Sequence, residues 1–187
     1  MSPAHDIPPT ERPTVGLFAT SSLLEDAGCV VSVPERQVCC GQPAYNAGDR
    51  KTAAVIARQT IALFEEFDYA VAPSGSCAAM LRLHFPALLR GDPAWAPRAA
   101  ALAAKSWELT SFLTDVRGID AVRSDFRGTV TYHDSCAGLR ELGVREQPRT
   151  LLASIAGLTL REHPTADVCC GFGGTFAIKY ADVSNAI

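Results

Sequence analysis

Two stretches of this sequence place reactive residues in the same order. Residues 34–41 read PERQVCCG and residues 164–171 read PTADVCCG, so a P-x-x-x-V lead precedes two adjacent cysteines and a glycine each time. Only seven cysteines occur among 187 residues, which makes accident a poor explanation. Neighbouring side chains diverge in regular structure, so adjacent cysteines reach one centre only from an irregular turn. Gly41 and Gly171 are therefore predicted to form those turns, because glycine accepts backbone angles that a Cβ would forbid.

Two single cysteines stand at predicted junctions between elements. Cys77 ends the sequence PSGSC, where a predicted strand over residues 69–72 passes into a helix, and Cys136 ends YHDSC. A helix N-terminus carries partial positive charge, which favours the thiolate form of cysteine. Soft thiolates from several loops are typical ligands of iron-sulfur clusters or zinc.

Two other roles of the cysteine pairs, inert burial and zinc binding, stay open. A vicinal pair can be buried as an inert hydrophobe, and zinc has the right softness, although no C-x-x-C pair of a typical structural zinc site occurs. Cys29, in the apolar run CVVSV, is predicted to be a core thiol. His133, on a predicted strand beside Asp134, is a candidate only for supporting a metal ligand.

The composition indicates a soluble protein of one ordinary domain or two small ones. The chain is 48% hydrophobic and 20% charged, with a net charge of -3, which disfavours nucleic acid as a partner. Residues 1–13 contain no apolar signal region, and no later apolar run has the length of a membrane span. We expect a cytoplasmic location, where an odd set of cysteines is not a disulfide framework.

The predicted elements form two copies of one β-α-β unit. The sequence TVTYHDSC at 129–136 corresponds to the strand at 14–20, and LLASIAG at 151–157 corresponds to LLEDAG at 23–28. This repetition predicts an α/β fold in which two pseudo-twofold-related β-α-β repeats build short, mostly parallel sheets flanked by helices. A further helix over 99–116 belongs to neither repeat. The predicted organisation is a flexible tail at 1–13, a first repeat at 14–90, a linker with the additional helix at 91–127, and a second repeat at 128–187.

Five motifs carry a resemblance to a known family. They are CCGQPAYNAG at 39–48, PSGSC at 73–77, YHDSC at 132–136, LRELG at 139–143 and CCGFGGTF at 169–176. Together they resemble the cysteine-rich CCG-domain proteins, most closely their lactate-utilization branch. Related CCG domains occur in heterodisulfide reductase and in the iron-sulfur component of glycolate oxidase.

The resemblance implies a ligand pattern of one cysteine, a distant CC pair and a further distant cysteine around a 4Fe-4S cluster. One set in this chain is Cys136, Cys169 and Cys170, and a second set, in the copy that lacks a segment matching the one around Cys136, is Cys39, Cys40 and Cys77. Each set is one thiolate short, because Ser21 and Ser22 stand where the family has a cysteine and another family cysteine would fall beyond Ile187. We expect that segments of a longer protein are missing at both places.

The resemblance also implies a function. It predicts an iron-sulfur electron-transfer subunit of a cytoplasmic L-lactate oxidation system, acting with companion subunits that include a ferredoxin-like iron-sulfur protein. One alternative is a thiol/disulfide redox subunit like that of heterodisulfide reductase. Another is a non-catalytic zinc-binding module.

Overall fold

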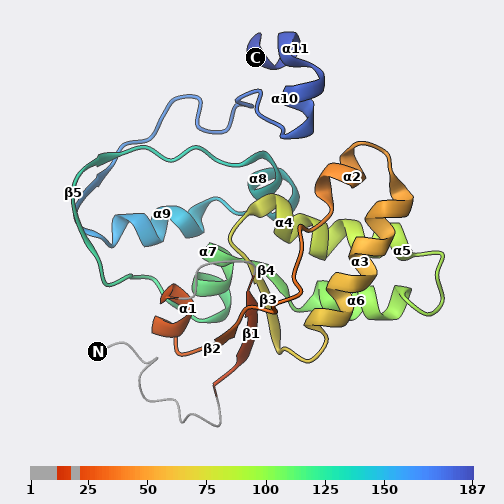
Figure 1. Cartoon of the computed structure of the whole chain (residues 1–187). Coiled ribbons are helices and arrows are strands. Elements are labelled where there is room, and N and C mark those ends of the chain that lie inside the picture. The colour runs from red at the N-terminus through yellow and green to blue at the C-terminus, as the bar shows by residue number, and fades with distance from the viewer. Residues whose placement is uncertain (1–11, 18–21) are drawn as a thin grey trace.

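The computed structural model describes residues 12–17 and 22–187 (Figure 1). Most of the predicted tail, the end of the predicted first strand at 18–20, and Ser21 lie outside the described residues. The strands are β1 (Thr14–Leu17), β2 (Val30–Ser32), β3 (Tyr69–Ala72), β4 (Ser106–Glu108), β5 (Asp125–Val130) and β6 (Ala156–Leu160). The helices are α1 (Ser22–Asp26), α2 (Gln42–Asn46), α3 (Arg50–Phe64), α4 (Gly75–Ala79), α5 (Phe85–Leu89), α6 (Ala96–Ala104), α7 (Leu109–Ser111), α8 (Cys136–Leu142), α9 (Glu146–Ala153), α10 (Thr175–Lys179) and α11 (Ala181–Asn185), with π-helical turns η3 (Met80–His84) and η4 (Phe112–Val116).

The larger sheet is parallel throughout, with strand order β2-β1-β3-β4. Successive side chains of a strand point to opposite faces, and β3 shows the consequence, since Ala70 packs in one core cluster and Val71 in another. The first cluster lies under α3, α5 and α6, and the second lies under α1 and η4. Coverage of both faces explains why β3 is almost entirely apolar.

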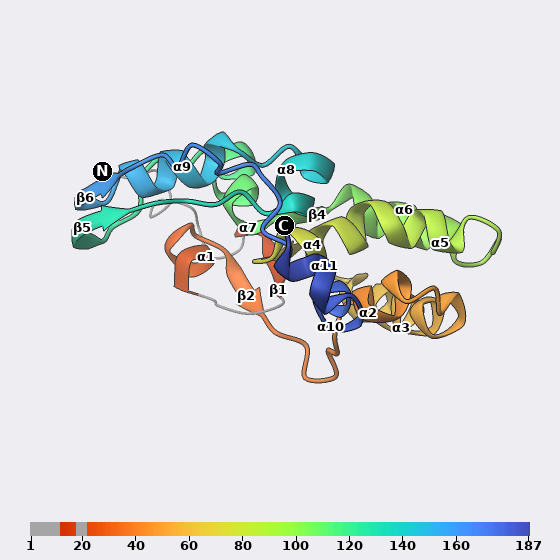
Figure 2. The ribbon, with the colours of Figure 1, turned by 90° about the horizontal axis from the view of Figure 1, so that it is seen from above.

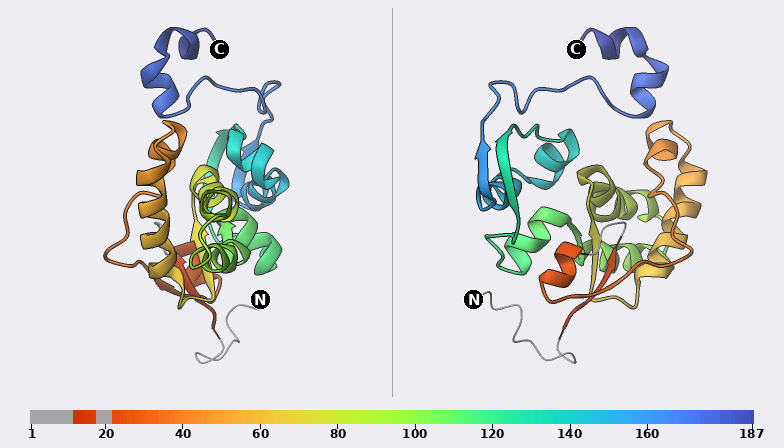
Figure 3. Two further views of the ribbon diagram at one scale, coloured as in Figure 1. Left: turned by 90° about the vertical axis from the view of Figure 1, so that its right-hand side faces the viewer. Right: turned by 60° about the vertical axis from the view of Figure 1, so that its left-hand side comes forward.

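The smaller sheet pairs β5 with β6, also in parallel. Helix α9 lies alongside these two strands (Figure 2). It joins the other half through Leu151, which packs in the second core cluster. After β6 the chain runs through an extended connection to α10 and α11 (Figure 3). Parallel sheets flanked by helices confirm the predicted fold class.

Two predicted elements differ from those observed. The predicted helix over 99–116 is interrupted by β4, because residues 106–108 pair with one edge of β3, and Glu108 then caps α7 by accepting a hydrogen bond from the Ser111 amide at 3.0 Å. The predicted strand at 129–136 ends at Val130, where its pairing with Leu160 stops. His133 therefore lies in a loop and not on a strand.

The long helix α3 after the first CCG turn begins directly after Asp49. The Asp49 carboxylate accepts a hydrogen bond from the Thr52 amide at 3.0 Å and caps α3. Among residues 12–17 and 22–187, none of the helices combines the length and the apolar character that crossing a bilayer requires.

Candidate functional site

The first CCG turn lies against the start of α4. Cys40 is buried, Cys77 is half-buried, and their Sγ atoms are 3.4 Å apart. Cys39, the other member of the vicinal pair, is exposed. The two thiols come from different segments of the chain, with α3 and β3 between them in sequence. They meet because Cys40 lies in the first core cluster and Cys77 packs against it.

The close contact makes these two thiols unequal. The hydrogen bond between them raises the pKa of Cys40, and burial raises it further. The same hydrogen bond lowers the pKa of Cys77 to about 6, assisted by hydrogen bonds with the hydroxyls of Ser74 and Ser76. Cys77 is therefore the thiolate of the pair and Cys40 its proton donor.

Gly41 forms the turn between the cysteine pair and α2. Its φ of 80° lies in the left-handed region, and a Cβ there would come within 3.1 Å of the Ile56 side chain. Helix α2 then brings the Tyr45 ring against the His84 ring, at a centroid distance of 4.9 Å. His84 Nε2 also lies 2.7 Å from a carboxylate oxygen of Glu141 on α8, which links this side of the molecule to the second repeat.

The second set begins at the first residue of α8. Ser135 caps this helix by accepting a hydrogen bond from the Gly138 amide at 3.1 Å, and exposed Cys136 follows directly. Partial loss of hydration raises the pKa of the Cys136 thiol, and so do a hydrogen bond with Cys169 and the nearby Cys170, while Arg140 opposes these effects. The second CCG turn thus meets Cys136.

The loop that carries Cys136 is anchored by a buried ion pair. The Asp134 carboxylate is almost fully buried and receives two hydrogen bonds from Arg149 of α9, at 2.8 and 2.9 Å. Arg149 also contacts Glu162, at 2.9 Å, and donates to the Arg145 carbonyl. The Asp134 amide donates to the Ala166 carbonyl at 2.8 Å, so the same loop holds the segment that leads to Cys169.

Gly171 forms the corresponding turn of the second copy. Its φ is 77°, its carbonyl accepts a hydrogen bond from Ser184 of α11 at 2.8 Å, and a Cβ would collide with the Ser184 carbonyl oxygen. Only glycine allows this close backbone approach.

The two helices that carry the single cysteines touch at their first turns (Figure 1). A Cβ on Gly75 would lie 2.7 Å from the Gly138 amide nitrogen and 2.9 Å from Ser135 Oγ. Two glycines therefore let α4 and α8 meet backbone to backbone, which brings the helix starts bearing Cys77 and Cys136 to one interface between the repeats. Sequence reasoning missed this contact, and the only signal was a glycine two positions from each cysteine.

The described residues do not form a complete metal site. Within residues 12–17 and 22–187, no three His, Cys, Asp or Glu side chains gather closely enough to hold a metal ion. Exposed His133 turns its ring to the Asp134 carbonyl at 3.0 Å, and Cys29 is buried in the second core cluster, as predicted. Two thiolates on one tetrahedral metal atom, with bonds of about 2.3 Å, stand roughly 3.8 Å apart, so the Cys40 and Cys77 sulfurs suit a thiophilic metal.

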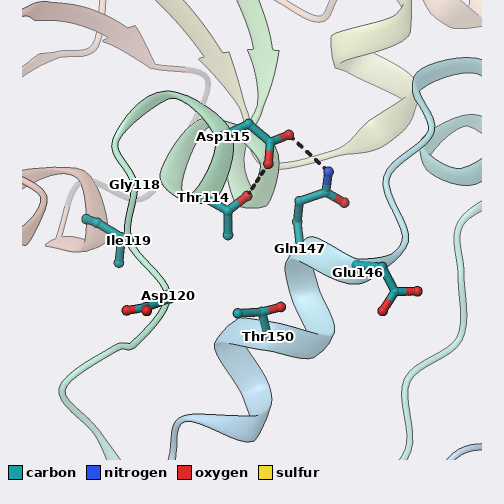
Figure 4. Close-up of a pocket in the computed structure, with 8 residues that line it drawn as sticks. All are labelled: Thr114, Asp115, Gly118, Ile119, Asp120, Glu146, Gln147 and Thr150. Atoms are coloured by element: carbon teal, nitrogen blue, oxygen red, sulfur yellow. Dashed lines mark hydrogen bonds between the residues drawn. The ribbon is translucent and has the colours of Figure 1, made fainter.

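A pocket of about 250 Å³ lies elsewhere, between η4 with its following loop and α9 (Figure 4). Asp115 lines it and accepts hydrogen bonds from Thr114 and from the Gln147 side-chain amide, at 2.8 and 2.9 Å. Its lining contains no cysteine, so the pocket is separate from the thiol sites.

Comparisons with known proteins identify the family of the chain. The family model described as cysteine-rich domain, CCG, matches residues 16–82 and 130–187. Lactate utilization protein A of Geobacillus kaustophilus is 49% identical over 166 residues, which cover 89% of this chain and 69% of that protein. The protein of the same name in Bacillus pumilus is 46% identical over 175 residues, covering 94% of this chain and 73% of the relative. No solved structure matches the chain.

Both CCG turns and both single cysteines fall inside the matched ranges. The identity to the relatives extends over most of the chain and is not confined to the cysteine motifs. The chain therefore belongs to the cysteine-rich CCG-domain family and, within it, to the lactate utilization protein A group.

Proposed function

We propose that this protein is an iron-sulfur electron-transfer subunit of a lactate utilization system. The observation that carries the proposal is the doubled arrangement in which a glycine-terminated cysteine pair meets a cysteine at a helix start. The relatives that match most of this chain are named for lactate utilization. The hydrogen-bond partners of Cys77 in the described residues are a cysteine and serines, and not a histidine or a carboxylate base, so electron transfer suits the site better than acid-base catalysis.

The proposal uses two ligand sets. Cys136, Cys169 and Cys170 form one set, and Cys39, Cys40 and Cys77 form the other. Gly41 and Gly171 aim the vicinal thiols, and the hydrogen bond from Cys40 favours the charged form of Cys77. When bound, a four-iron cluster would supply one-electron chemistry at a potential set by hydrogen bonds and exposure.

The thiol pairs must open to receive such a cluster. In a four-iron cluster each thiolate binds a different iron atom, whereas Cys40 and Cys77 are now in hydrogen-bond contact at 3.4 Å. Exposed Cys39 and Cys170 can approach from the solvent side. Metal binding and ordering of the ligand loops are therefore coupled.

The setting of the proposed subunit is a cytoplasmic assembly. Electrons taken from lactate need a path to an acceptor, and a subunit that holds iron-sulfur clusters would pass them between partners. We propose companion subunits that include a ferredoxin-like iron-sulfur protein. The isolated protein is then expected to show no lactate turnover.

The direct test is iron and sulfide quantification on protein prepared without oxygen, together with its visible spectrum. We expect iron, inorganic sulfide and a brown colour that is lost in Cys40→Ser and Cys169→Ser variants, while Cys29→Ser, a core control, keeps them. Colourless protein with stoichiometric zinc would replace the proposal with a zinc module.

A genetic test addresses the lactate assignment. A deletion strain without another lactate oxidase should fail to grow on L-lactate as sole carbon source and should recover with the wild-type gene. Recovery with Cys29→Ser but not with Cys169→Ser would tie growth to the thiol site. Normal growth of the deletion strain would refute the lactate role.

A further inference from the structure

We propose that Cys40 and Cys77 form a reversible disulfide when the metal-free protein meets a peroxide. The inference goes beyond the proposed function, because it concerns these two thiols without a cluster. It assigns a modification site to one pair among the six candidate ligands.

The geometry places these two sulfur atoms within reach of a bond. The two Sγ atoms are 3.4 Å apart and need to approach by only about 1.4 Å to reach the S–S length of roughly 2.0 Å. Both residues pack in or against one core cluster, on the CCG turn before α2 and on α4, so the contact does not depend on a loose surface segment.

The exposure of the two thiols determines which of them reacts with a peroxide first. Cys77 is half-buried and reachable from solvent, whereas Cys40 is only 2% exposed. A peroxide therefore meets Cys77 first, and Cys40 is already in place as the resolving thiol. Adjacent Cys39 is exposed, and since side chains of neighbouring residues diverge, it is not placed to compete.

The reaction balances in two steps. The Cys77 sulfur attacks one peroxide oxygen, an S–O bond forms, the O–O bond breaks, and hydroxide leaves to take up a proton. The Cys40 sulfur then attacks the Cys77 sulfur, an S–S bond forms, the S–O bond breaks, and the second hydroxide takes up the Cys40 proton. Each cysteine gives one electron, hydrogen peroxide is reduced to two water molecules, and a dithiol restores both thiols.

The consequence is protection of an empty site. A disulfide occupies both sulfurs and prevents them from binding metal, but it also stops the oxidation of Cys77 before the irreversible sulfinic stage. The reduced pair, once restored by a dithiol, can bind metal again.

The test uses the whole 187-residue protein, depleted of metal under reducing conditions and then treated without oxygen with one equivalent of hydrogen peroxide. Free thiols are blocked, and tryptic peptides are sequenced by tandem mass spectrometry. We expect peptide 37–50 joined to peptide 59–82 with the loss of two hydrogens, with fragment ions that place the bond at Cys40. A dithiol should abolish the cross-link.

Single cysteine substitutions test which residues form the cross-link. Cys39→Ser, the matched control, should keep the cross-link at the parent yield, and Cys40→Ser should lose it and, when a second equivalent of peroxide is added, accumulate sulfinic acid at Cys77. Cross-linking through Cys39, or sulfinic acid at Cys77 of the wild-type protein without a cross-link, would overturn the inference. The wild-type mapping needs no variant to fold, and because no iron is present, its result is independent of the cluster proposal.

Discussion

At the scale of single residues, Gly171 combines a left-handed backbone conformation with a close backbone neighbour. Gly171→Ala should lower the iron content of anaerobically prepared protein, because the new Cβ meets the Ser184 carbonyl and shifts the turn that holds Cys169. The effect should approach that of Cys169→Ser. Iron and sulfide per chain measure it.

Gly48 offers a matched control. Its φ is 83°, like that of Gly171, but a Cβ there meets nothing within 4 Å. Gly48→Ala should cost about 1 kcal/mol of unfolding free energy from backbone strain and leave the iron content unchanged. Equal iron in the Gly48→Ala and Gly171→Ala proteins would contradict a role of Gly171 in ligand geometry.

Buried Cys29 and exposed Cys136 lie in different environments, so substituting them should affect different properties of the protein. Cys29→Ser buries an unpaired hydroxyl in the second core cluster and should lower the unfolding free energy by about 2 kcal/mol while the iron content persists. Cys136→Ser, at an exposed helix start, should lower the iron content with little change in urea stability of the metal-free protein. The reverse pattern would make Cys136 structural.

At the scale of elements, Arg149 connects α9 to the loop before α8. Arg149→Met should destabilise the protein by about 3 kcal/mol, because the buried Asp134 carboxylate loses both hydrogen bonds from its partner. Urea unfolding monitors this change. The same variant should bind less iron, because the Cys136 loop and the segment before Cys169 lose their common anchor.

Two further variants test that explanation. Arg145→Met removes an exposed cation of the same type, paired with Glu146 at 3.7 Å, and should change stability by less than about 0.5 kcal/mol. Adding Asp134→Asn to Arg149→Met should recover part of the loss, since the buried charge is gone. Additive losses in the double variant would show that the pair is not coupled.

The contact between α4 and α8 gives another prediction at this scale. Gly75→Ala should push the two helix starts apart, cost about 2 kcal/mol and reduce iron at both ligand sets. Gly91→Ala is the matched control, because a Cβ at Gly91 meets nothing within 4 Å. A Gly75→Ala protein as stable and as iron-rich as Gly91→Ala would show that the backbone contact is dispensable.

At the scale of the whole molecule, several surface carboxylates contribute to acid sensitivity. Hydrogen bonds lower the pKa of four of them in the folded state, and these are Asp49, Glu65, Asp68 and Asp92. Each lowered pKa adds stability that is fully present above the ordinary values of 3.8 for Asp and 4.5 for Glu and is lost as pH falls below them. The urea midpoint should therefore stay level near neutral pH and fall below about pH 4.5.

Asp68 is the carboxylate to vary, because it accepts hydrogen bonds from the Thr14 amide and hydroxyl, both at 2.7 Å, and so fastens β1. Asp68→Asn should flatten the acid dependence of the urea midpoint, whereas Asp26→Asn, which removes an exposed carboxylate of α1, should leave its shape unchanged. An unaltered acid profile in Asp68→Asn would assign the acid loss to other groups.

Much of the architecture was predictable because it follows from local patterns. Repetition of the CCG units and the short apolar runs predicted parallel β-α-β units, and the apolar run around Cys29 predicted a core thiol. Strand β4 was not predictable, because its three residues continue a helix-like pattern and become a strand only through pairing with β3.

The sequence by itself determined the family, the parallel α/β fold and the cysteines that are candidate ligands, since residue types and their order carry that information. Tertiary structure decided which thiols meet, and it placed Cys40 in contact with Cys77 and Cys136 beside Cys169. It also decided that Arg149 binds Asp134 and that Gly75 meets Gly138. These contacts join residues far apart in the chain, and no local pattern specifies them, because they form only when packing of both sheet faces brings the repeats together.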